Sequence, residues 1–265
     1  MITSTANAQV KQLIQLHKKA KIRNAQDVFV VEGMKMFREA PRDRIAKAYV
    51  SSSFYEEAER RTLLEGLSYE VVEDQVFRAM SDTQTPQGVL CILRQYHYGL
   101  EELLGKTGSP KSGEPNPLLL VLENLQDPGN LGTILRTAEG AGVTGVILNR
   151  GSVDIYNPKT IRSTMGSIYR VPFLYAEDLQ EILGMLRQRG IRSFAAHLKG
   201  ADFYDQENYQ GGTAFLIGNE SNGLSQELSD FADAYIRIPM EGQLESLNAA
   251  VSAAILMYEA YRQRR

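Results

Sequence analysis

The feature that most constrains the fold is the alternation of short apolar runs with helical patterns over residues 118–265. Apolar or extended runs lie at 118–123, 145–148, 169–174, 193–197, 213–217 and 235–238, and helical patterns lie at 131–141, 158–165, 177–189 and 225–231. Strands of a parallel sheet read as continuous apolar runs, because helices cover both faces of such a sheet. The sequence therefore predicts an α/β domain with a parallel sheet, ending in a helix that begins near Ser246.

The first hundred residues have the pattern of a smaller α/β domain. Helical spacing occurs at 7–20 and 34–40, and strand-like runs occur at 28–31, 48–51, 69–72 and 89–92. The stretch GLEELLGKTGSPKSGEPNP that follows is rich in Gly, Pro and Ser and poor in apolar residues, as interdomain linkers are. The predicted organisation is a first domain at 1–98, a linker at 99–116 and a second domain at 117–265.

Composition places the chain among ordinary globular proteins. Its 265 residues are 43% hydrophobic and 23% charged. No apolar run approaches the roughly 20 residues of a membrane span, and the first residues lack the apolar core of a secretory signal. The single cysteine, Cys91, excludes an internal disulfide. Together these features predict a soluble, cytoplasmic protein.

The distribution of charge allows a local contact with nucleic acid. A net charge of −3 argues against a protein that binds nucleic acid over its whole surface. One short window without acidic residues is nevertheless basic, and it contains Lys11, His17, Lys18, Lys19, Lys21 and Arg23. The window is either an RNA-binding surface or a solvated helix face.

Three polar loops follow predicted strands of the second domain: NLQDPGN, GNESNG and MEGQLESLN. Ligands of parallel sheets bind beyond the carboxyl ends of the strands, so these loops are the candidate site. Asn130 is the predicted N-cap of the helix that follows the first loop, and Ser246 is the predicted N-cap of the last helix. Arg136 is either a surface arginine or a group that holds a phosphate or a developing oxyanion.

Two other kinds of site are disfavoured. The stretch GAGVTG, residues 140–145, matches the spacing of a dinucleotide-binding loop, but a helix precedes it and a strand follows it, which is the reverse of the required order. Its glycines more simply end a helix. The three histidines are scattered and Cys91 has no second cysteine near it, so no metal site is predicted.

Taken in order, NLQDPGNLGTILRTA, FLIGNESNGLS and IPMEGQLESLNAAVSAAI resemble the three motifs of the SpoU (TrmH) family, which are RNA ribose 2'-O-methyltransferases of the knotted SPOUT superfamily. The stretches VKQLIQLHKKAKIRNAQDVFVVEG and TPQGVLCIL resemble the substrate-binding domain of the subfamily that acts on ribosomal RNA, a small ribosomal-protein-like RNA-binding fold. The resemblance implies a C-terminal domain with a deep trefoil knot, a homodimer and S-adenosylmethionine as cofactor.

The resemblance also implies a reaction and a set of site residues. The reaction is methyl transfer to a ribose 2'-hydroxyl, of a guanosine in 23S ribosomal RNA; the alternatives are transfer RNA as substrate, or a non-catalytic RNA-binding assembly factor. By motif position, backbone groups of Gly218, Ile238 and Leu247 hold the cofactor. The catalytic positions are Asn130, Arg136, Glu220, Ser246 and Asn248. The RNA contacts are Lys11, Lys18, Lys19, Lys21 and Arg23.

Overall fold

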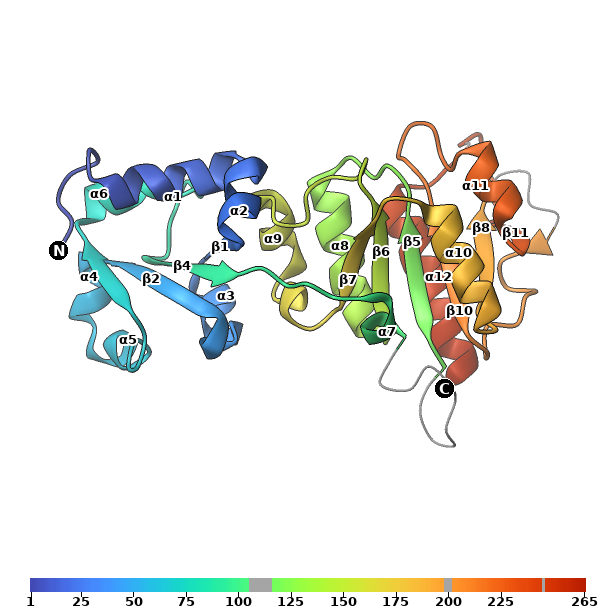
Figure 1. The fold of residues 1–265 in the computed structure, drawn as a ribbon, viewed down its shortest axis with the longest axis horizontal. Coiled ribbons are helices and arrows are strands. Elements are labelled where there is room, and N and C mark those ends of the chain that lie inside the picture. Colours follow the sequence, from blue (N-terminus) through green and yellow to red (C-terminus); the bar gives the residue numbers. More distant parts are fainter. Residues whose placement is uncertain (105–115, 198–201, 245) are drawn as a thin grey trace. The chain divides into compact units, whose positions relative to one another are not determined.

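The computed structural model describes residues 1–104, 116–197, 202–244 and 246–265. The chain forms two compact units (Figure 1). The first unit comprises Met1–Tyr96 together with Asp154–Tyr169, and the second comprises His97–Val153 together with Arg170–Arg265. Residues 154–169, which the sequence analysis assigned to the second domain, therefore group with the first unit.

The first unit is built on a four-stranded mixed sheet in the order β1-β4-β2-β3. Its strands are β1 (Val28–Glu32), β2 (Ile45–Ser51), β3 (Tyr69–Val72) and β4 (Val89–Arg94). Strand β4 runs antiparallel to β1 and β2, and β3 is parallel to β2. The helices are α1 (Ala8–Lys18), α2 (Ala20–Gln26), α3 (Met34–Glu39), α4 (Ser52–Glu56), α5 (Ala58–Thr62) and α6 (Asp74–Met80). The small α/β domain predicted from the sequence is confirmed.

The helix predicted at 7–20 is divided in the structure, because Lys19 is extended and separates α1 from α2. Leu13 and Leu16 of α1 and Phe77 of α6 are fully buried and pack on the sheet in one apolar cluster. The buried side chains of α1, Val10, Leu13 and Leu16, recur at the spacing of one helix face, which is why the helical pattern was visible in the sequence.

Aromatic contacts tie residues 154–169, which include α9 (Pro158–Thr164), to the first unit. The ring of Tyr156 lies 4.7 Å from that of Phe29, and its hydroxyl accepts a hydrogen bond from the Tyr96 N–H at 2.7 Å. The Tyr169 hydroxyl donates to the Met36 carbonyl at 2.9 Å. All of these groups are buried or nearly so, and none of the contacts can be read from the local sequence.

The predicted linker at 99–116 begins as ordered structure. Helix α7 (Leu100–Leu103) occupies its first residues, and Leu103 and Leu104 are buried in the core of the second unit. A Cβ atom placed on Gly145 would lie 2.6 Å from Leu103 Cβ, so the leucine fills the space that this glycine leaves. The prediction of a linker is wrong for these residues, and residues 105–115 of it lie outside the described part.

The second unit contains a parallel seven-stranded sheet in the order β7-β6-β5-β10-β8-β11-β9. The strands are β5 (Leu118–Leu122), β6 (Gly145–Asn149), β7 (Phe173–Ala176), β8 (Arg192–Ala196), β9 (Asp202–Phe203), β10 (Thr213–Ile217) and β11 (Ala234–Arg237). The parallel sheet is as predicted. The extended stretch expected at 169–174 is a 3₁₀ turn (Ser167–Tyr169) followed by β7, and the two-residue strand β9 was not predicted.

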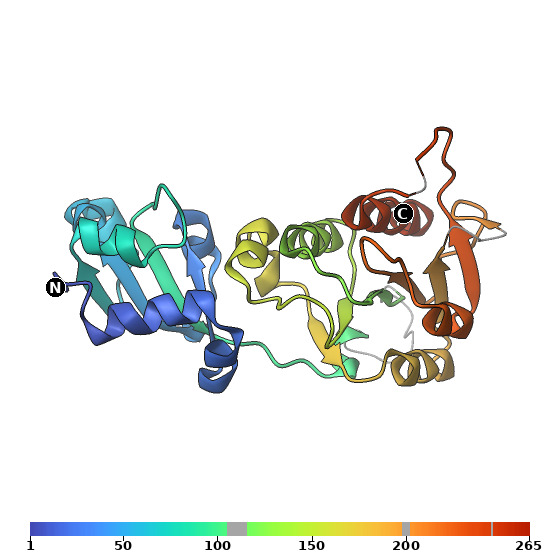
Figure 2. The same ribbon diagram turned by 90° about the horizontal axis from the view of Figure 1, so that it is seen from above.

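Helices cover both faces of this sheet (Figure 2). Helices α8 (Pro128–Gly140) and α12 (Ala249–Arg264) pack together on one face, and α10 (Leu179–Gln188) and α11 (Gln226–Phe231) pack together on the other. From β5 the chain adds β6 and β7 on one side, and β10 later pairs with the free edge of β5. The carboxyl ends of β5 and β10 are therefore neighbours, and the two polar loops that follow them lie side by side.

Candidate active site

The carboxylate of Glu220 joins the loop after β10 to the loop after β5. Its Oε1 accepts hydrogen bonds from the Asp127 N–H at 2.9 Å and from the Asn130 side-chain amide at 3.0 Å. Its Oε2 accepts from the Gln126 N–H at 3.0 Å. A single carboxylate thus holds three donors of a loop that lies about ninety residues earlier in the chain.

These donors also set the charge of Glu220. Partial burial by itself would raise the pKa of the carboxyl, but the hydrogen bonds from Gln126, Asn130 and Asp127 outweigh it and hold the pKa below its ordinary value. Glu220 is therefore ionised at neutral pH. A carboxylate with three donors and a lowered pKa is a weak base, and its hydrogen bonds hold the two loops together.

Asn130 connects this pair of loops to the third. The Asn248 side-chain amide donates to Asn130 Oδ1 at 3.0 Å, and Asn130 in turn donates to Glu220. Asn248 Oδ1 also accepts from the Ala250 N–H at 2.8 Å and so caps α12. The three motifs are therefore joined by one chain of hydrogen bonds, Glu220–Asn130–Asn248.

Both N-caps predicted from the sequence are wrong. Asp127 caps α8 by accepting from the Asn130 N–H at 2.8 Å, because Pro128 already occupies the first helical position. Asn248 caps α12, and Ser246 lies two residues before it. The corrections have a functional consequence: the side chain of Asn130, not used as a cap, is free to bridge Glu220 and Asn248.

A second network of amides fixes the base of the first loop. The side chains of Asn124 and Asn149 contact each other at 2.8 Å, and Asn149 Oδ1 accepts from the Asn124 N–H at 2.8 Å. The Asn219 amide donates to the Asn124 carbonyl at 2.8 Å. Asn124 has a φ of 53°, a left-handed conformation that asparagine tolerates better than most residues. The sequence analysis missed this network, although Asn149 stands at the carboxyl end of a predicted strand.

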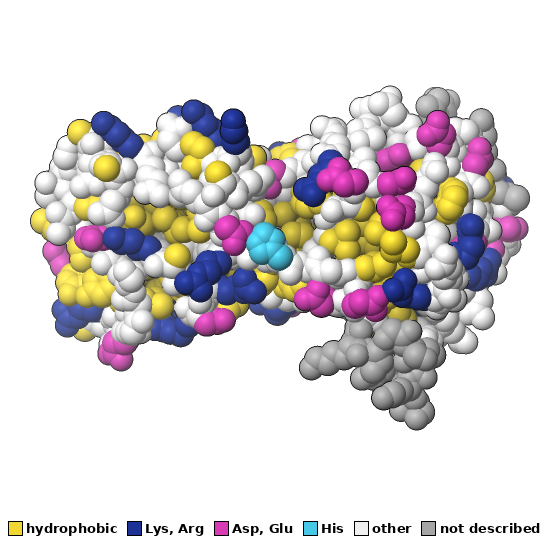
Figure 3. Space-filling model, in the orientation of Figure 1, with side chains coloured by type: hydrophobic (Ala, Val, Ile, Leu, Met, Phe, Trp, Pro, Cys, Tyr) yellow, Lys and Arg dark blue, Asp and Glu magenta, His cyan; other side chains and the backbone are white. Residues whose placement is uncertain are grey.

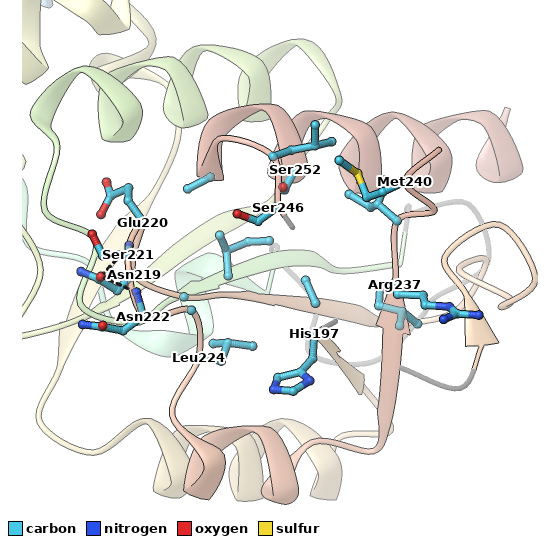
Figure 4. Close-up of a pocket in the computed structure, with 18 residues that line it drawn as sticks. His197, Asn219, Glu220, Ser221, Asn222, Leu224, Arg237, Met240, Ser246 and Ser252 are labelled. Carbon is cyan, nitrogen blue, oxygen red and sulfur yellow. Dashed lines mark hydrogen bonds between the residues drawn. The ribbon is translucent and has the colours of Figure 1, made fainter. Parts of the chain in front are cut away.

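A cavity of about 430 Å³ lies beside these loops (Figure 4). Residues from the ends of β8, β10 and β11 and from the beginning of α12 line it. Five residues predicted from the sequence are among them: Gly218, Glu220, Ile238, Ser246 and Leu247. The volume is within the range of small-molecule sites.

The lining of the cavity combines a close backbone approach, apolar side chains and a few hydroxyl groups. A Cβ atom on Gly218 would overlap the backbone of Gly223 and Leu224, so only glycine lets the chain pass so closely here. Leu224, Ile236 and Leu247 supply apolar surface, and Ser246 and Ser252 supply hydroxyl groups. Apolar walls with a few polar groups are typical of small-molecule and cofactor sites.

Comparison with known proteins agrees with this geometry. The profile of the SpoU rRNA methylase family matches residues 117–258, which contain all three loops, and that of the MRM3-like substrate-binding domain matches residues 7–91.

The chain belongs to the SpoU rRNA methylase family.

Relatives and solved structures match nearly the whole chain. The 23S rRNA (guanosine(2553)-2'-O)-methyltransferase RlmP of Bacillus subtilis is 31% identical over 97% of both chains. The AdoMet-bound rRNA methyltransferase of Sinorhizobium meliloti is 32% identical, with a TM-score of 0.84 over 98% of this chain and 97% of that one. The SpoU methyltransferase AviRb of Streptomyces viridochromogenes, in complex with AdoMet, is 25% identical, with a TM-score of 0.85 over 97% and 98%. This SpoU protein is an RNA 2'-O-methyltransferase, and its cofactor is S-adenosylmethionine.

Several residues that line the cavity of this SpoU protein were not predicted, among them His197, Arg237 and Met240. His197 follows β8, and its ring lies edge-on to Tyr235 with centroids 5.4 Å apart. The guanidinium of Arg237 lies 4.5 Å from the ring centre of Phe203 and points away from the Glu220 loop (Figure 4). His197 could have been found, because it stands at the carboxyl end of a predicted strand, as the three loops do.

Arg136 is placed differently from the other catalytic candidates. It is exposed on α8 and is not among the residues that line the cavity. Six residues separate it from Asn130, which corresponds to about one and two-thirds helical turns. The two side chains therefore leave α8 on different faces. Within one chain, Asn130 contacts Glu220, whereas Arg136 does not line the cavity beside it.

The basic window of the first unit is mostly exposed. Lys11, Lys18, Lys19 and Lys21 are exposed on and between α1 and α2, and Figure 3 shows basic side chains along this edge. Arg23 is only 3% exposed; it donates to the Leu16 carbonyl at 2.6 Å and forms an ion pair with Asp154. The prediction that Arg23 contacts RNA is therefore wrong, because its guanidinium is used inside the unit.

Within the described ranges, no group of three or more His, Cys, Asp or Glu side chains could hold a metal ion. No helix in the same part of the chain combines the length and apolar content needed to cross a membrane.

Proposed function

We propose that this SpoU protein methylates the ribose 2'-hydroxyl of a guanosine in 23S ribosomal RNA. The observation that carries the proposal is the hydrogen-bonded chain Glu220–Asn130–Asn248, which joins the three family motifs beside the cavity. The choice of RNA is supported by the relative RlmP, whose similarity extends over both units, including the part that matches a substrate-binding domain.

The cofactor residues follow from the cavity. Gly218, Ile238 and Leu247 line it, and we assign their backbone groups to cofactor binding. S-adenosylmethionine, when bound, supplies a methyl group on a positively charged sulfur that is already a good leaving group. Catalysis by the protein then consists mainly of holding the ribose hydroxyl in line with that methyl group. Ser246, which lines the same cavity, would shape the site from the third motif.

The remaining chemistry is the loss of the hydroxyl proton. An arginine with a pKa above about 12 is a poor base at neutral pH. We assign Arg136 to stabilising the forming alkoxide and to gripping an adjacent phosphate, and the hydroxyl proton passes by way of that phosphate to solvent water. Asn130 and Asn248 orient the ribose, and Glu220 keeps their loops together.

We propose a homodimer as well, in which a second copy covers exposed apolar residues of α12. Val251, Tyr258 and Tyr261 of α12 are 47%, 49% and 42% exposed and form one apolar stripe at helical spacing. We propose that a second copy covers this stripe, and that the segments lining the cavity form the trefoil knot typical of the superfamily. Light scattering of the purified chain measures the first point, and a monomer at micromolar concentration contradicts it.

The test of function is ribose-methylation mapping of total RNA from cells with and without the gene. We expect one 2'-O-methyl mark in 23S RNA to disappear and to return with the wild-type gene. Arg136→Ala and Arg136→Lys should both fail to restore it, because lysine lacks the bidentate fork. Loss of a transfer-RNA mark would assign the chain to transfer RNA, and no lost mark would favour a non-catalytic assembly factor.

A further inference from the structure

A second cavity, of about 440 Å³, lies entirely within the first unit. Its walls come from α3, the beginning of α4, α5, α6 and the turn before β4. The turn TPQG, part of a stretch that resembles a substrate-binding domain, lies here beside the helix that follows VVEG. Nothing in the proposed catalytic site uses this cavity.

Three arginines from three different helices line the cavity: Arg38 of α3, Arg60 of α5 and Arg78 of α6. Asp74 is the one carboxylate among the lining residues. Its Oδ1 already accepts hydrogen bonds from the Ser53 N–H and hydroxyl, both at 3.1 Å. The lining therefore carries a net charge of about +2, in a protein whose total charge is negative.

The guanidinium groups are available to a ligand. Arg38 and Arg78 are exposed, and no hydrogen bond or ion pair of either is found in the described part of the chain. Arg60 pairs with Glu57 at 2.8 Å, but the two side chains are 39% and 54% exposed. An ion pair this exposed is weak and can be displaced by a better acceptor.

The TPQG turn, which also lines the cavity, is tied to α3 and packs against β2. Gln87 Oε1 accepts from the Met34 N–H at 2.7 Å and ties the TPQG turn to the first residue of α3. Gly88 has a φ of 78°, and a Cβ atom there would lie 2.6 Å from Ser51 Oγ. Because these contacts already hold the turn, less of its conformational freedom is lost when a ligand binds.

We propose that this cavity binds a phosphodiester group of the RNA substrate, as a subsite separate from the lysines of α1 and α2. The inference rests on the proposed function in taking RNA as the partner. Guanidinium groups on separate helices suit phosphate oxygens, which accept paired hydrogen bonds. RNA helices are recognised largely through phosphates and shape. A second phosphate held at a fixed place on the enzyme would therefore help to position the RNA so that one particular ribose reaches the active site.

The test compares full-length variants for binding to unmodified 23S RNA transcribed in vitro. For the double variant Arg38→Ala/Arg78→Ala, we expect RNA affinity to fall about tenfold or more, as when charge-assisted hydrogen bonds are removed. The slope of log affinity against log salt should become shallower by about one unit for each phosphate that the variant no longer binds. The matched control is Arg94→Ala, an exposed arginine of the same unit outside the cavity, and its RNA affinity should stay within about twofold of wild type.

Two further measurements separate this role from a structural one. The double variant should keep the wild-type melting temperature and affinity for S-adenosylmethionine, and its methyl transfer should show a raised KM with an unchanged kcat. Arg78→Lys, which keeps the positive charge, should retain more RNA affinity than Arg78→Ala. RNA affinity and salt slope equal to wild type, or an equal loss in Arg94→Ala, would overturn the inference.

The outcomes also distinguish this inference from the proposed function. If the wild-type enzyme methylates 23S RNA while the double variant binds and methylates it normally, the function stands and the subsite is refuted. If the wild-type enzyme does not methylate 23S RNA but its RNA binding depends on the arginines, the function is refuted and the subsite stands. Binding of inorganic phosphate that Arg78→Ala abolishes, with unchanged RNA affinity, would make the cavity a free-anion site and overturn the inference.

Discussion

The substitution Glu220→Gln tests whether one carboxylate holds the site together. The wild-type carboxylate accepts from Asp127 and Asn130 on Oε1 and from Gln126 on Oε2, at 2.9–3.0 Å. A glutamine keeps one acceptor oxygen, so its NH₂ group must face at least one of these donors. The change therefore removes at least one hydrogen bond and the charge that strengthens the others.

The size of the effect follows from these hydrogen bonds. A hydrogen bond to a charged group contributes about 1.5–3 kcal/mol, and partial exposure of Glu220 reduces this, so we expect a loss of about 2 kcal/mol. In thermal unfolding this corresponds to a fall of roughly 5 °C for a unit of this size. If the loss falls instead on closure of the loops around the cofactor, affinity for S-adenosylmethionine falls about 30-fold.

The pH dependence gives an independent check. Because the pKa of Glu220 is lowered in the folded protein, its stabilisation is present above the pKa of the unfolded chain, about 4.3. It is lost as the pH falls through the lower folded pKa. The difference in free energy of unfolding between wild type and Glu220→Gln should thus be largest above about pH 5 and shrink on acidification.

The assays are thermal and urea unfolding at several pH values, with calorimetric titration of S-adenosylmethionine. Glu227→Gln is the matched control, because Glu227 is exposed on neighbouring α11 and no hydrogen bond of its side chain is found within the described residues. Equal stability, cofactor affinity and pH dependence in Glu220→Gln and wild type would refute the reasoning.

Substitutions in three other regions test separate parts of the argument. Gly218→Ala should weaken cofactor binding by about tenfold or more in calorimetric titration, because the added Cβ overlaps the backbone of the neighbouring turn, whereas Gly184→Ala in open space on α10 should stabilise the chain by about 0.5–1 kcal/mol. Asn248→Ala should cost about 1 kcal/mol in urea unfolding through loss of the cap. Asn248→Ser should keep the cap but lower kcat/KM. Full activity in the serine variant would show that the hydrogen bond from the Asn248 side-chain amide to Asn130 is dispensable. Lys18→Glu with Lys19→Glu should weaken RNA binding and its salt dependence in filter binding while cofactor affinity is unchanged; unchanged RNA affinity would make this edge an ordinary solvated surface.

Some features of this protein could be predicted from local sequence alone. The apolar runs gave the strands of the parallel sheet because burial on both faces requires continuous apolar side chains, and β5 and β10 lie almost where expected. The position of three polar loops at strand ends gave the candidate site, and Gly218, Glu220, Ile238, Ser246 and Leu247 do line one cavity. These are properties of single segments, set by periodicity and by turn chemistry.

The helix caps and the burial of one basic residue were predicted wrongly, for different reasons. Asn130 and Ser246 were reasonable caps by residue type, yet Asp127 and Asn248 hold those positions, and for α8 the local signal that was missed is Pro128 at the first helical position. Arg23 belonged to a basic window in the sequence, but the carboxylate of Asp154 and the end of α1 enclose it.

The sequence by itself determined most of the elements, their order and the family motifs, because each depends on residues within one segment. Tertiary structure decided which segments meet: β10 pairs beside β5, residues 154–169 join the first unit, and Arg38, Arg60 and Arg78 converge on one cavity. Glu220 shows the physical reason. Its donors lie about ninety residues away, so its pKa and its role follow from a sheet order that no local pattern encodes.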